Sequence, residues 1–509
     1  MTVNVDDDGT GDAMAVIGTQ TSDRFFVTAS IISVDKRFIA AGFGPPVTPP
    51  AVLRETITYG GIETLRVEAD TGIDLITIAT THTDVSIFNG GRGNDWIGIR
   101  GTLGTTDING GDGDDVIHAG SNAGLNLNEA EPASGEDLFQ GPADGQLESF
   151  AVALFVSGGE GNDLFHADDQ GDTTNGQGGV LRSTTLIGLG MGAAITYDDT
   201  FENFDVTLGS GDGGSTPAEA FVVESTHLAA TTIDAGPGDD DIRIETINGP
   251  TTILGGDGSD LIIVSSTAGD TPGIFNGTVN LISLGLLTID GGLDGATGDI
   301  LRVYDSGDET GGTGALTSST ISGLGMTLGI AYTGFELLRL DLSAGNDELH
   351  IDGTHATRTK VNGANGADLF NIESISGDTI IFGDPVATDP NAATYGDTFR
   401  VNYNEFGVQT ERNGVVGELT LHGRRGSDQY FIGLAGSGGA IINVLDESAG
   451  DPLGIDVLNV FGTNANEYFL VRANIDRTLG MIAAVQTDQN GDPVPGGSIE
   501  RINYDGDIN

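Results

Sequence analysis

One short pattern recurs along the whole chain and constrains its fold more than any other feature. It reads acid, any residue, large apolar residue, any residue, small or β-branched residue, as in DWIGI from Asp95. Such period-two alternation is typical of a β-strand, and the glycines between the segments interrupt any helical window. The pattern begins at Asp23, Asp74, Asp95, Asp115, Asp137, Asp163, Glu219, Asp240, Asp260, Asp299, Asp347, Asp368, Asp397, Asp428, Asp456 and Glu467.

A second short strand is expected before many of these anchor acids, as in VSIFNGG before Asp95 and TDINGG before Asp115. Asp74, Asp95 and Asp115 are 21 and 20 residues apart, and 22 residues separate Asp115 from Asp137. A unit this short cannot bury its own apolar face and must stack on its neighbours. The sequence therefore predicts an all-β fold, a right-handed parallel β-solenoid with coils of about 20–22 residues and loop insertions.

A longer repeat is superimposed on this pattern. The segments ITYGG, ITYDD and IAYTG begin at Ile57, Ile195 and Ile330, which are 138 and 135 residues apart. Because the chain begins and ends within a repeat, we expect a window from a longer array, and MTVNVDDDG lacks the regions of a signal peptide. We expect one continuous rod made of a preceding repeat's tail (1–56), a first super-repeat (57–194), a second (195–329), and a third with the start of another (330–509).

Histidines fall at repeated positions of the pattern. A Thr-His pair ending in His82, His227 or His355 follows each copy of the longer repeat, and we expect it to form structural hydrogen bonds. His118, His166 and His350 occupy the third position after an anchor, which the alternation directs away from the core.

The composition excludes several classes of partner. Acidic residues outnumber basic ones 75 to 20, the formal net charge is −55, and Lys36 and Lys360 are the two lysines. Nucleic acids and anionic membrane surfaces would be repelled by such a chain. The absence of cysteine excludes disulfides and thiolate zinc sites, and the apolar run Phe150–Val156 is too short for a membrane span.

Glycine and aspartate share the turn before several anchors, as in GGRGND from Gly90 and GGDGDD from Gly110. Glycine permits positive φ, so the backbone can curl and direct its carbonyls to one point. Carboxylates stacked at the strand spacing would repel one another, and Ca²⁺ prefers six to eight such hard oxygen ligands. The other interpretation is an ordinary strand connection in which Asp hydrogen-bonds locally.

GGRGNDWIG, GGDGDDVIH, GGEGNDLFH, AGPGDDDIR and GGDGSDLII resemble the nonapeptide of the repeats-in-toxin (RTX) calcium-binding β-rolls. The wider pattern resembles very long bacterial cell-surface or secreted repeat proteins. A β-roll carries its motif on both edges of a coil, whereas the second edge here reads TTI or TxI, so half of the sites are missing. The resemblance implies Ca²⁺ ligands among Asp95, Asp115, Asp137, Asp163, Asp240, Asp260, Asp347, Asp368, Asn94, Asp112, Asp114 and Asp257.

These features predict a non-enzymatic, extracellular structural or adhesive segment that is stiffened by Ca²⁺ and associates with itself, end to end or laterally. Cell-surface polysaccharide is a further candidate partner, and no membrane insertion is expected. The alternative from another class is a polysaccharide-active β-helix, a lyase or epimerase. Such enzymes need clustered cations, whereas the arginines of this chain are expected to be scattered one per coil: Arg243, Arg302, Arg339 and Arg400. A third possibility, a string of β-sandwiches, predicts antiparallel hairpins.

Overall fold

A computed structural model gives the fold of two compact units, Met1–Ile242 with Ile247–Asp260, and Arg243–Thr246 with Leu261–Asn509. The anchors Asp137, Glu219 and Glu467 lie outside the residues that it describes. Throughout the described residues the regular structure is β-strand, and none forms a helix that could span a membrane. The structure describes residues 2–6, 11–36, 53–126, 144–174, 177–210, 220–270, 276–385, 395–410, 412–434, 439–446, 454–463, 468–474, 479–497, 499–505 and 508.

One sheet of the first unit places the strands that follow the anchors Asp23, Asp74, Asp95, Asp115 and Asp163 next to one another, and three further strands continue it, two of which precede the anchors Asp240 and Asp260. Its strands pair in parallel, each with the next: β3 (Asp23–Val27), β7 (Leu75–Ile78), β9 (Trp96–Ile99), β11 (Val116–Ala119), β13 (Leu164–Asp168), β17 (Asn203–Thr207), β19 (Ala230–Asp234) and β21 (Thr251–Leu254). Trp96 pairs with Val116, and Val116 pairs with Leu164. The strand that follows β11 in the sheet is therefore β13, and Asp137 lies outside the described residues.

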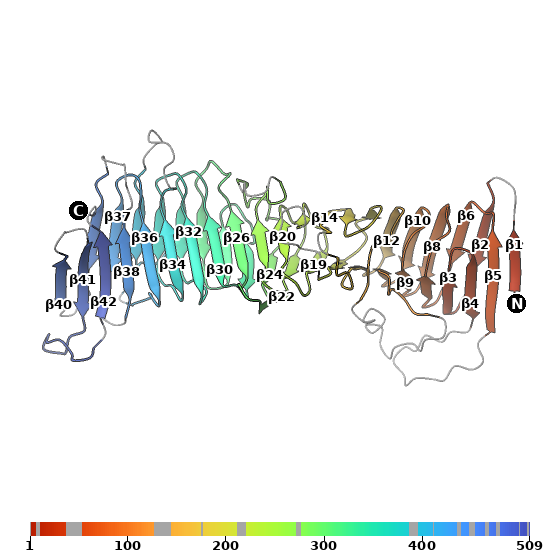
Figure 1. Cartoon of the computed structure of the whole chain (residues 1–509), viewed down its shortest axis with the longest axis horizontal. Coiled ribbons are helices and arrows are strands. Elements are labelled where there is room, and N and C mark those ends of the chain that lie inside the picture. The colour runs from red at the N-terminus through yellow and green to blue at the C-terminus, as the bar shows by residue number, and fades with distance from the viewer. Residues whose placement is uncertain are drawn as a thin grey trace. The chain divides into compact units, whose positions relative to one another are not determined.

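The other sheet of the first unit contains the strands that precede the Gly-Asp turns. It pairs in parallel, in this order, β2 (Ala13–Ile17), β6 (Thr64–Glu68), β8 (Val85–Arg92), β10 (Thr106–Asp112), β12 (Leu154–Glu160) and β16 (Ile195–Tyr197). Figure 1 shows β6, β8, β10 and β12 side by side. From β6 to β13 the chain passes alternately between the two sheets.

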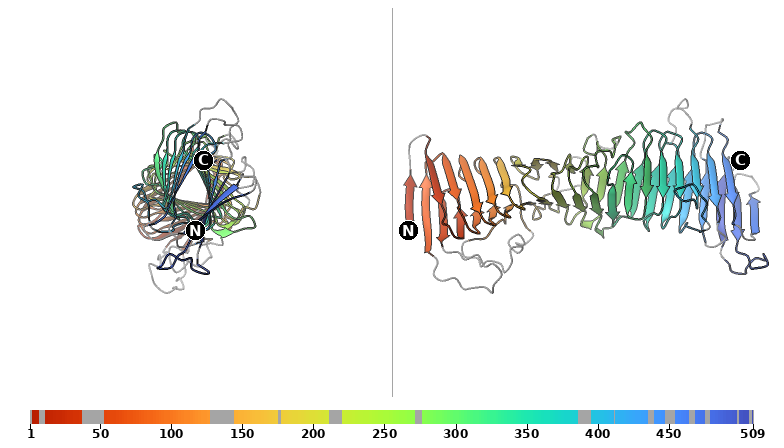
Figure 2. Two further views of the ribbon diagram at one scale, coloured as in Figure 1. Left: turned by 90° about the vertical axis from the view of Figure 1, so that its left-hand side faces the viewer. Right: turned by 180° about the vertical axis from the view of Figure 1, so that it is seen from behind.

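The second unit is likewise built from strands of two sheets (Figure 2). One contains β24 (Leu287–Asp290), β29 (Ile330–Thr333), β28 (Thr320–Gly323), β27 (Thr313–Leu316), β31 (Glu348–Ile351), β33 (Leu369–Ile372), β35 (Thr398–Val401), β37 (Gln429–Gly433) and β39 (Val457–Phe461). The other contains β23 (Leu261–Val264), β26 (Ile300–Tyr304), β30 (Leu337–Asp341), β32 (Arg358–Asn362), β34 (Asp378–Phe382), β36 (Glu418–His422), β38 (Ile441–Leu445), β42 (Ile499–Asp505), β41 (Leu479–Val485) and β40 (Tyr468–Ala473).

Antiparallel pairing marks each copy of the longer repeat. In the first unit β3 pairs antiparallel with β4 (Ile31–Lys36), which pairs with β5 (Leu53–Gly60); β14 (Gly179–Arg182), β15 (Thr185–Gly188) and β16 form a similar triplet in the opposite sheet. In the second unit β27–β29 and β40–β42 do the same. The other pairings described above are parallel, which disfavours a string of hairpin sandwiches. Short strands complete the set: β1 (Thr2–Asp6), β18 (Phe221–Val223), β20 (Asp241–Ile244), β22 (Asp257–Gly258) and β25 (Leu293–Asp294).

The second and fourth residues after the described anchors are buried in the core, as the alternation predicts, except after Asp456, where Leu458 and Val460 are half-buried. In the first unit Phe25, Ile76 and Ile97 are at most 1% exposed and follow one another in register. In the second unit the rings of Phe370 and Phe399 stack 5.1 Å apart, and those of Phe399 and Tyr430 stack 5.0 Å apart. Continuous apolar columns of this kind bury surface along each unit and stabilise the stacking of its strands.

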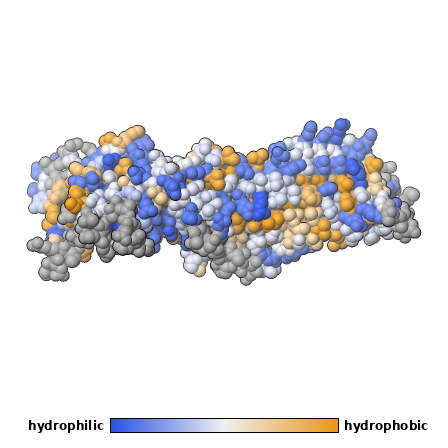
Figure 3. All heavy atoms as spheres, turned by 90° about the horizontal axis from the view of Figure 1, so that it is seen from above, coloured by the Kyte–Doolittle hydropathy of each residue, from blue (hydrophilic) through white to orange (hydrophobic). Residues whose placement is uncertain are grey.

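The outward-facing positions of the strands carry both apolar and polar side chains, unlike the core positions. Figure 3 shows hydrophobic atoms interspersed with hydrophilic ones on the face seen from above. Phe155 of β12, for example, is 41% exposed. Single exposed apolar side chains of this kind are normal for a protein surface.

Candidate cation-binding turns and the buried carboxylate ladder

The glycines of the turn motif are required by the close approach of neighbouring turns. Gly91 and Gly93 have φ values of +105° and +125°, in the region that favours glycine. A Cβ atom on Gly91 would lie 2.1 Å from the carbonyl oxygen of Asp70, and one on Gly93 would lie 1.5 Å from that of Gly72. Any other residue would force successive turns apart.

The first glycine of the motif makes room for the aspartate that ends it. A Cβ atom on Gly90 would lie 2.5 Å from Oδ2 of Asp95 and 2.4 Å from the carbonyl oxygen of Gly110. The same relation links Gly110 to Asp115, at 2.4 Å. Each carboxylate therefore folds back beneath its own turn, and the aspartates are buried rather than displayed at the edge.

These aspartates form a ladder of hydrogen bonds, here called the carboxylate ladder. The backbone amide of Asp74 donates to Oδ1 of Asp95 at 2.7 Å, that of Asp95 to Asp115 at 2.7 Å, and that of Asp115 to Asp163 at 2.7 Å. Asp115 and Asp163 are 48 residues apart in the sequence, and they meet because β11 pairs with β13. Corresponding amide-to-carboxylate bonds join Asp240 to Asp260, Asp347 to Asp368, Asp368 to Asp397, Asp397 to Asp428, and Asp428 to Asp456.

Burial makes the charged form of these carboxylates unfavourable. Desolvation raises the pKa of Asp74 and Asp115 to about 7 and that of Asp95 to about 8, although amide hydrogen bonds oppose the shift. In the second unit it raises the pKa of Asp368 and Asp428 to about 8. The Oδ2 atoms of these five aspartates are buried without a hydrogen-bond partner among the described residues. A proton or a cation would relieve this cost.

The turns fit a calcium ion in part. Oδ2 of Asp95 and the carbonyl oxygen of Gly110 border the same space beside Gly90, so a carboxylate oxygen and a backbone oxygen are available together. Both are hard oxygen donors of the kind that Ca²⁺ prefers. Within the described residues the ladder aspartates do not gather into groups of three or more ligating side chains. Further ligands would therefore have to be backbone carbonyls.

Four other predicted ligands lie on the solvent side of the turns. Oδ1 of Asn94 accepts a hydrogen bond from the backbone amide of Asp114 at 3.1 Å. These two exposed residues lie outside the carboxylate ladder and run parallel to it. Asp112 is exposed and lies 3.2 Å from Nε of Arg92, and Asp257 is also exposed. An exposed ion pair such as Arg92–Asp112 contributes little to stability. None of these four residues belongs to the carboxylate ladder.

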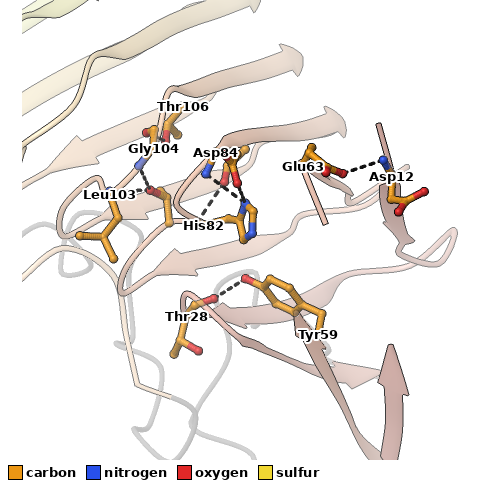
Figure 4. A network of polar contacts seen from close by, with 11 residues as sticks. Asp12, Thr28, Tyr59, Glu63, His82, Asp84, Leu103, Gly104 and Thr106 are labelled. Carbon is orange, nitrogen blue, oxygen red and sulfur yellow. Dashed lines mark hydrogen bonds and ion pairs between the residues drawn. The ribbon is translucent and has the colours of Figure 1, made fainter. Parts of the chain in front are cut away.

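Sequence reasoning missed the glutamates that extend the ladder. Asp163 donates its amide to Oε2 of Glu202 at 2.8 Å, and Asp299 donates to Oε2 of Glu336 at 2.6 Å. Glu63 accepts the amide of Asp12 at 2.7 Å in the same way (Figure 4). The signal was present in the repeated segments ETLRV, ENFDV and ELLRL, which place an acid two residues before an apolar one.

The Thr-His pairs form hydrogen bonds at the corners of the turns. Figure 4 shows Leu103 and Gly104 close to the first pair, and their amides donate to Oγ1 of Thr81 at 2.9 and 3.4 Å. Nδ1 of His82 accepts the amide of Asp84 at 3.2 Å. Each histidine also contacts a tyrosine of the longer repeat, with ring centroids 5.9–6.2 Å apart: Tyr59–His82, Tyr197–His227 and Tyr332–His355.

Three basic residues form a row, here called the cationic row, on the second unit. Arg302 of β26 pairs in register with Arg339 of β30, which pairs with Lys360 of β32. Lys360 lies 5.0 Å from the ring centroid of Phe382, and Arg424 lies 3.9 Å from the same ring. Arg302 and Arg339 do occur one per strand, as expected, but their equal register brings them together with Lys360 instead of scattering them.

Comparison with known proteins adds no family to this description. A scan against protein-family models finds no match for the chain, and no curated protein matches it.

Proposed function

We propose that the chain is a non-enzymatic structural segment of a secreted or cell-surface protein, and that each unit is a right-handed parallel β-solenoid. In this proposal the chain resists deformation instead of performing chemistry, and it assembles with further copies. Cohesion comes from the apolar columns, and stiffness comes from the backbone ladders. The RTX-like turns make Ca²⁺ the cation that neutralises the buried acids.

The carboxylate ladder is the observation that carries this proposal. It repeats one contact between successive strands, from Asp23 through Asp74, Asp95 and Asp115 to Asp163. A contact that joins each strand only to its neighbours is the organisation expected of a solenoid. The carboxylate ladder stabilises the stacking of strands directly, because each carboxylate accepts a hydrogen bond from a backbone amide at the start of the adjacent strand.

Calcium would complete this arrangement outside the cell. Asp95, Asp115 and Asp163, and Asp347 with Asp368, would supply carboxylate oxygens, and the turn carbonyls would supply the remaining ligands. Ions that bind the folded turns and not the unfolded chain stabilise the fold by mass action. The segment would therefore become rigid on meeting extracellular Ca²⁺.

Thermal melting at pH 8 tests this proposal. The chain is first equilibrated with EDTA, and circular dichroism is followed as Ca²⁺ or Mg²⁺ is added in excess. A Ca²⁺-selective rise in the melting temperature and in β signal supports the proposal. Equal melting curves with EDTA, Ca²⁺ and Mg²⁺ would contradict the calcium role. A soluble, unaggregated chain that gives no β signal in any of these solutions would contradict the solenoid.

The cationic row favours a second candidate function, the binding of an acidic polysaccharide. Arg302, Arg339 and Lys360 stand at the strand spacing of about 4.8 Å in a chain whose net charge is −55. Asp341 pairs with Arg339 at 2.6 Å, and burial together with the neighbouring arginines lowers the pKa of Lys360. Cations with an aromatic neighbour such as Phe382 form a surface that suits uronate sugars along a polymer.

Binding of polygalacturonate in EDTA at low salt tests this second function. The double variant Arg302→Gln/Lys360→Gln should bind about 10-fold more weakly, and wild-type binding should weaken as salt rises. Arg66→Gln is the matched control, because Arg66 lies on the first unit beside Glu68. No binding by the wild-type chain, or equal losses in both variants, would contradict this function.

A further inference from the structure

Three potential metal ligands that are distant in the sequence meet on the first unit. His118 of β11 pairs in register with His166 of β13, and Asp168 follows two residues later on the same face of that strand. One ligand atom from each of the three lies within 4.8 Å of the others. Nε2 of His118 is 3.6 Å from Oδ2 of Asp168, and the two imidazole rings are 5.0 Å apart.

The insertion that follows β11 covers this cluster. Nδ2 of Asn122 donates to Oδ2 of Asp168 at 3.0 Å, and a Cβ atom on Gly145 would lie 2.3 Å from the same oxygen. His118 is 2% exposed and Asp168 is 5% exposed, whereas His166 is half-buried. His118 faces away from the core, as the alternation predicts, but it is buried there instead of being exposed to solvent.

The three side chains are held ready to bind a cation. Oγ1 of Thr207 donates to Oδ1 of Asp168 at 3.1 Å, and the amide of Gln170 donates to the same atom at 3.0 Å. Such outer contacts orient a metal ligand.

We propose that His118, His166 and Asp168 form a binding site for a divalent transition-metal ion, with Zn²⁺ as the best match. Two imidazole nitrogens and one carboxylate oxygen suit Zn²⁺ and disfavour Ca²⁺, which takes oxygen ligands. The half-buried His166 leaves a side on which water would complete the coordination. The ion would bind β11 to β13 and hold the insertion over them through Asn122 and Asp168.

Metal titration of the whole chain tests this site independently of the calcium proposal. After removal of metals, Zn²⁺ is titrated at pH 7 in the presence of excess Ca²⁺, and Co²⁺ is added separately to observe its visible absorption. One Zn²⁺ per chain and a Co²⁺ spectrum of tetrahedral or five-coordinate type with nitrogen ligands support the site. Absence of Zn²⁺ binding, or a Co²⁺ spectrum of aqueous type, would show that the cluster is a buried His–Asp pair only.

Two variants assign the ligands. His166→Gln and Asp168→Asn should each weaken Zn²⁺ binding at least 10-fold, because each removes a direct ligand. His350→Gln is the control, because His350 is also a half-buried strand histidine beside an acid, Glu348 at 3.5 Å, but lies in the second unit. Equal affinity in His166→Gln and His350→Gln would overturn the assignment, provided that circular dichroism shows both variants folded.

Discussion

Replacement of one ladder carboxylate by its amide, Asp95→Asn, tests the energetics of the buried acids. Asp95 is 0% exposed, and desolvation raises its pKa to about 8. Asparagine keeps an oxygen that can accept the amide of Asp74, which now donates at 2.7 Å, but carries no charge. The variant thus removes the titration while it preserves the hydrogen bond.

The size of the pH effect on the free energy of unfolding follows from the difference between the pKa of Asp95 in the folded chain and in the unfolded chain. An unfolded aspartate titrates near pH 4, so above pH 5 the unfolded chain has lost this proton while the folded chain retains it until about pH 8. The stability that protonated Asp95 contributes is therefore fully present at acidic pH and is lost as the pH rises toward 8. Each pH unit lowers the free energy of unfolding by about 1.4 kcal/mol, or about 4 kcal/mol between pH 5 and pH 8 for this one residue.

Urea unfolding in EDTA at pH 5 and pH 8 measures this difference. Trp96, the one tryptophan of the chain, directly follows Asp95, so its fluorescence reports on the first unit. Asp95→Asn should reduce the pH-dependent loss by about 4 kcal/mol, whereas Asp112→Asn, at an exposed acid of the neighbouring turn, should leave it unchanged. Equal stability of the wild-type chain at both pH values, or a larger loss in Asp95→Asn at pH 8, would refute the reasoning.

Three further changes probe other parts of the fold. Excess Ca²⁺ at pH 8 should restore the stability that the wild-type chain loses in EDTA, and should restore less in Asp95→Asn; equal recovery would place the ion elsewhere. Gly90→Ala should destabilise the chain by about 1–3 kcal/mol, because its Cβ atom would lie 2.5 Å from Oδ2 of Asp95. Thermal melting measures this loss, and Gly439→Ala is the control, because no atom lies within 4 Å of a Cβ atom at that position. Thr81→Val should cost about 1–3 kcal/mol in Trp96-detected unfolding, because the amide of Leu103 loses its acceptor; an equal loss in exposed Thr83→Val would contradict that role.

The local pattern was sufficient to predict the strands and the core. Period-two alternation depends on neighbouring residues alone, so Ile97, Ile117 and Phe165 could be assigned to the interior before any contact was known. The glycine at the start of the motif was interpreted only as a flexible residue. Its other role depends on three-dimensional contacts: the carbonyl oxygen of Gly110 in the next turn and the carboxylate of Asp95 in its own turn leave no room for a Cβ atom at Gly90.

Contacts across insertions could not be predicted in the same way. Asp115 meets Asp163 because the chain between β11 and β12 leaves the repeating path and returns, and spacing alone does not encode where it returns. The cluster of His118 with His166 depends on the same return. The row of Arg302, Arg339 and Lys360 results from the register of three neighbouring strands. Predicting it requires knowing which strands are neighbours.

Proton release on calcium binding tests most directly the claim that the folded chain neutralises its buried carboxylates. The metal-free protein is brought to pH 7 without buffer, and released protons are titrated as Ca²⁺ is added. Because burial raises the pKa of Asp74, Asp95 and Asp368 to about 7 or 8, these side chains hold protons that a bound cation would displace. The account predicts a saturating release that is smaller in Asp95→Asn. Calcium binding without proton release, or no calcium binding, would contradict it.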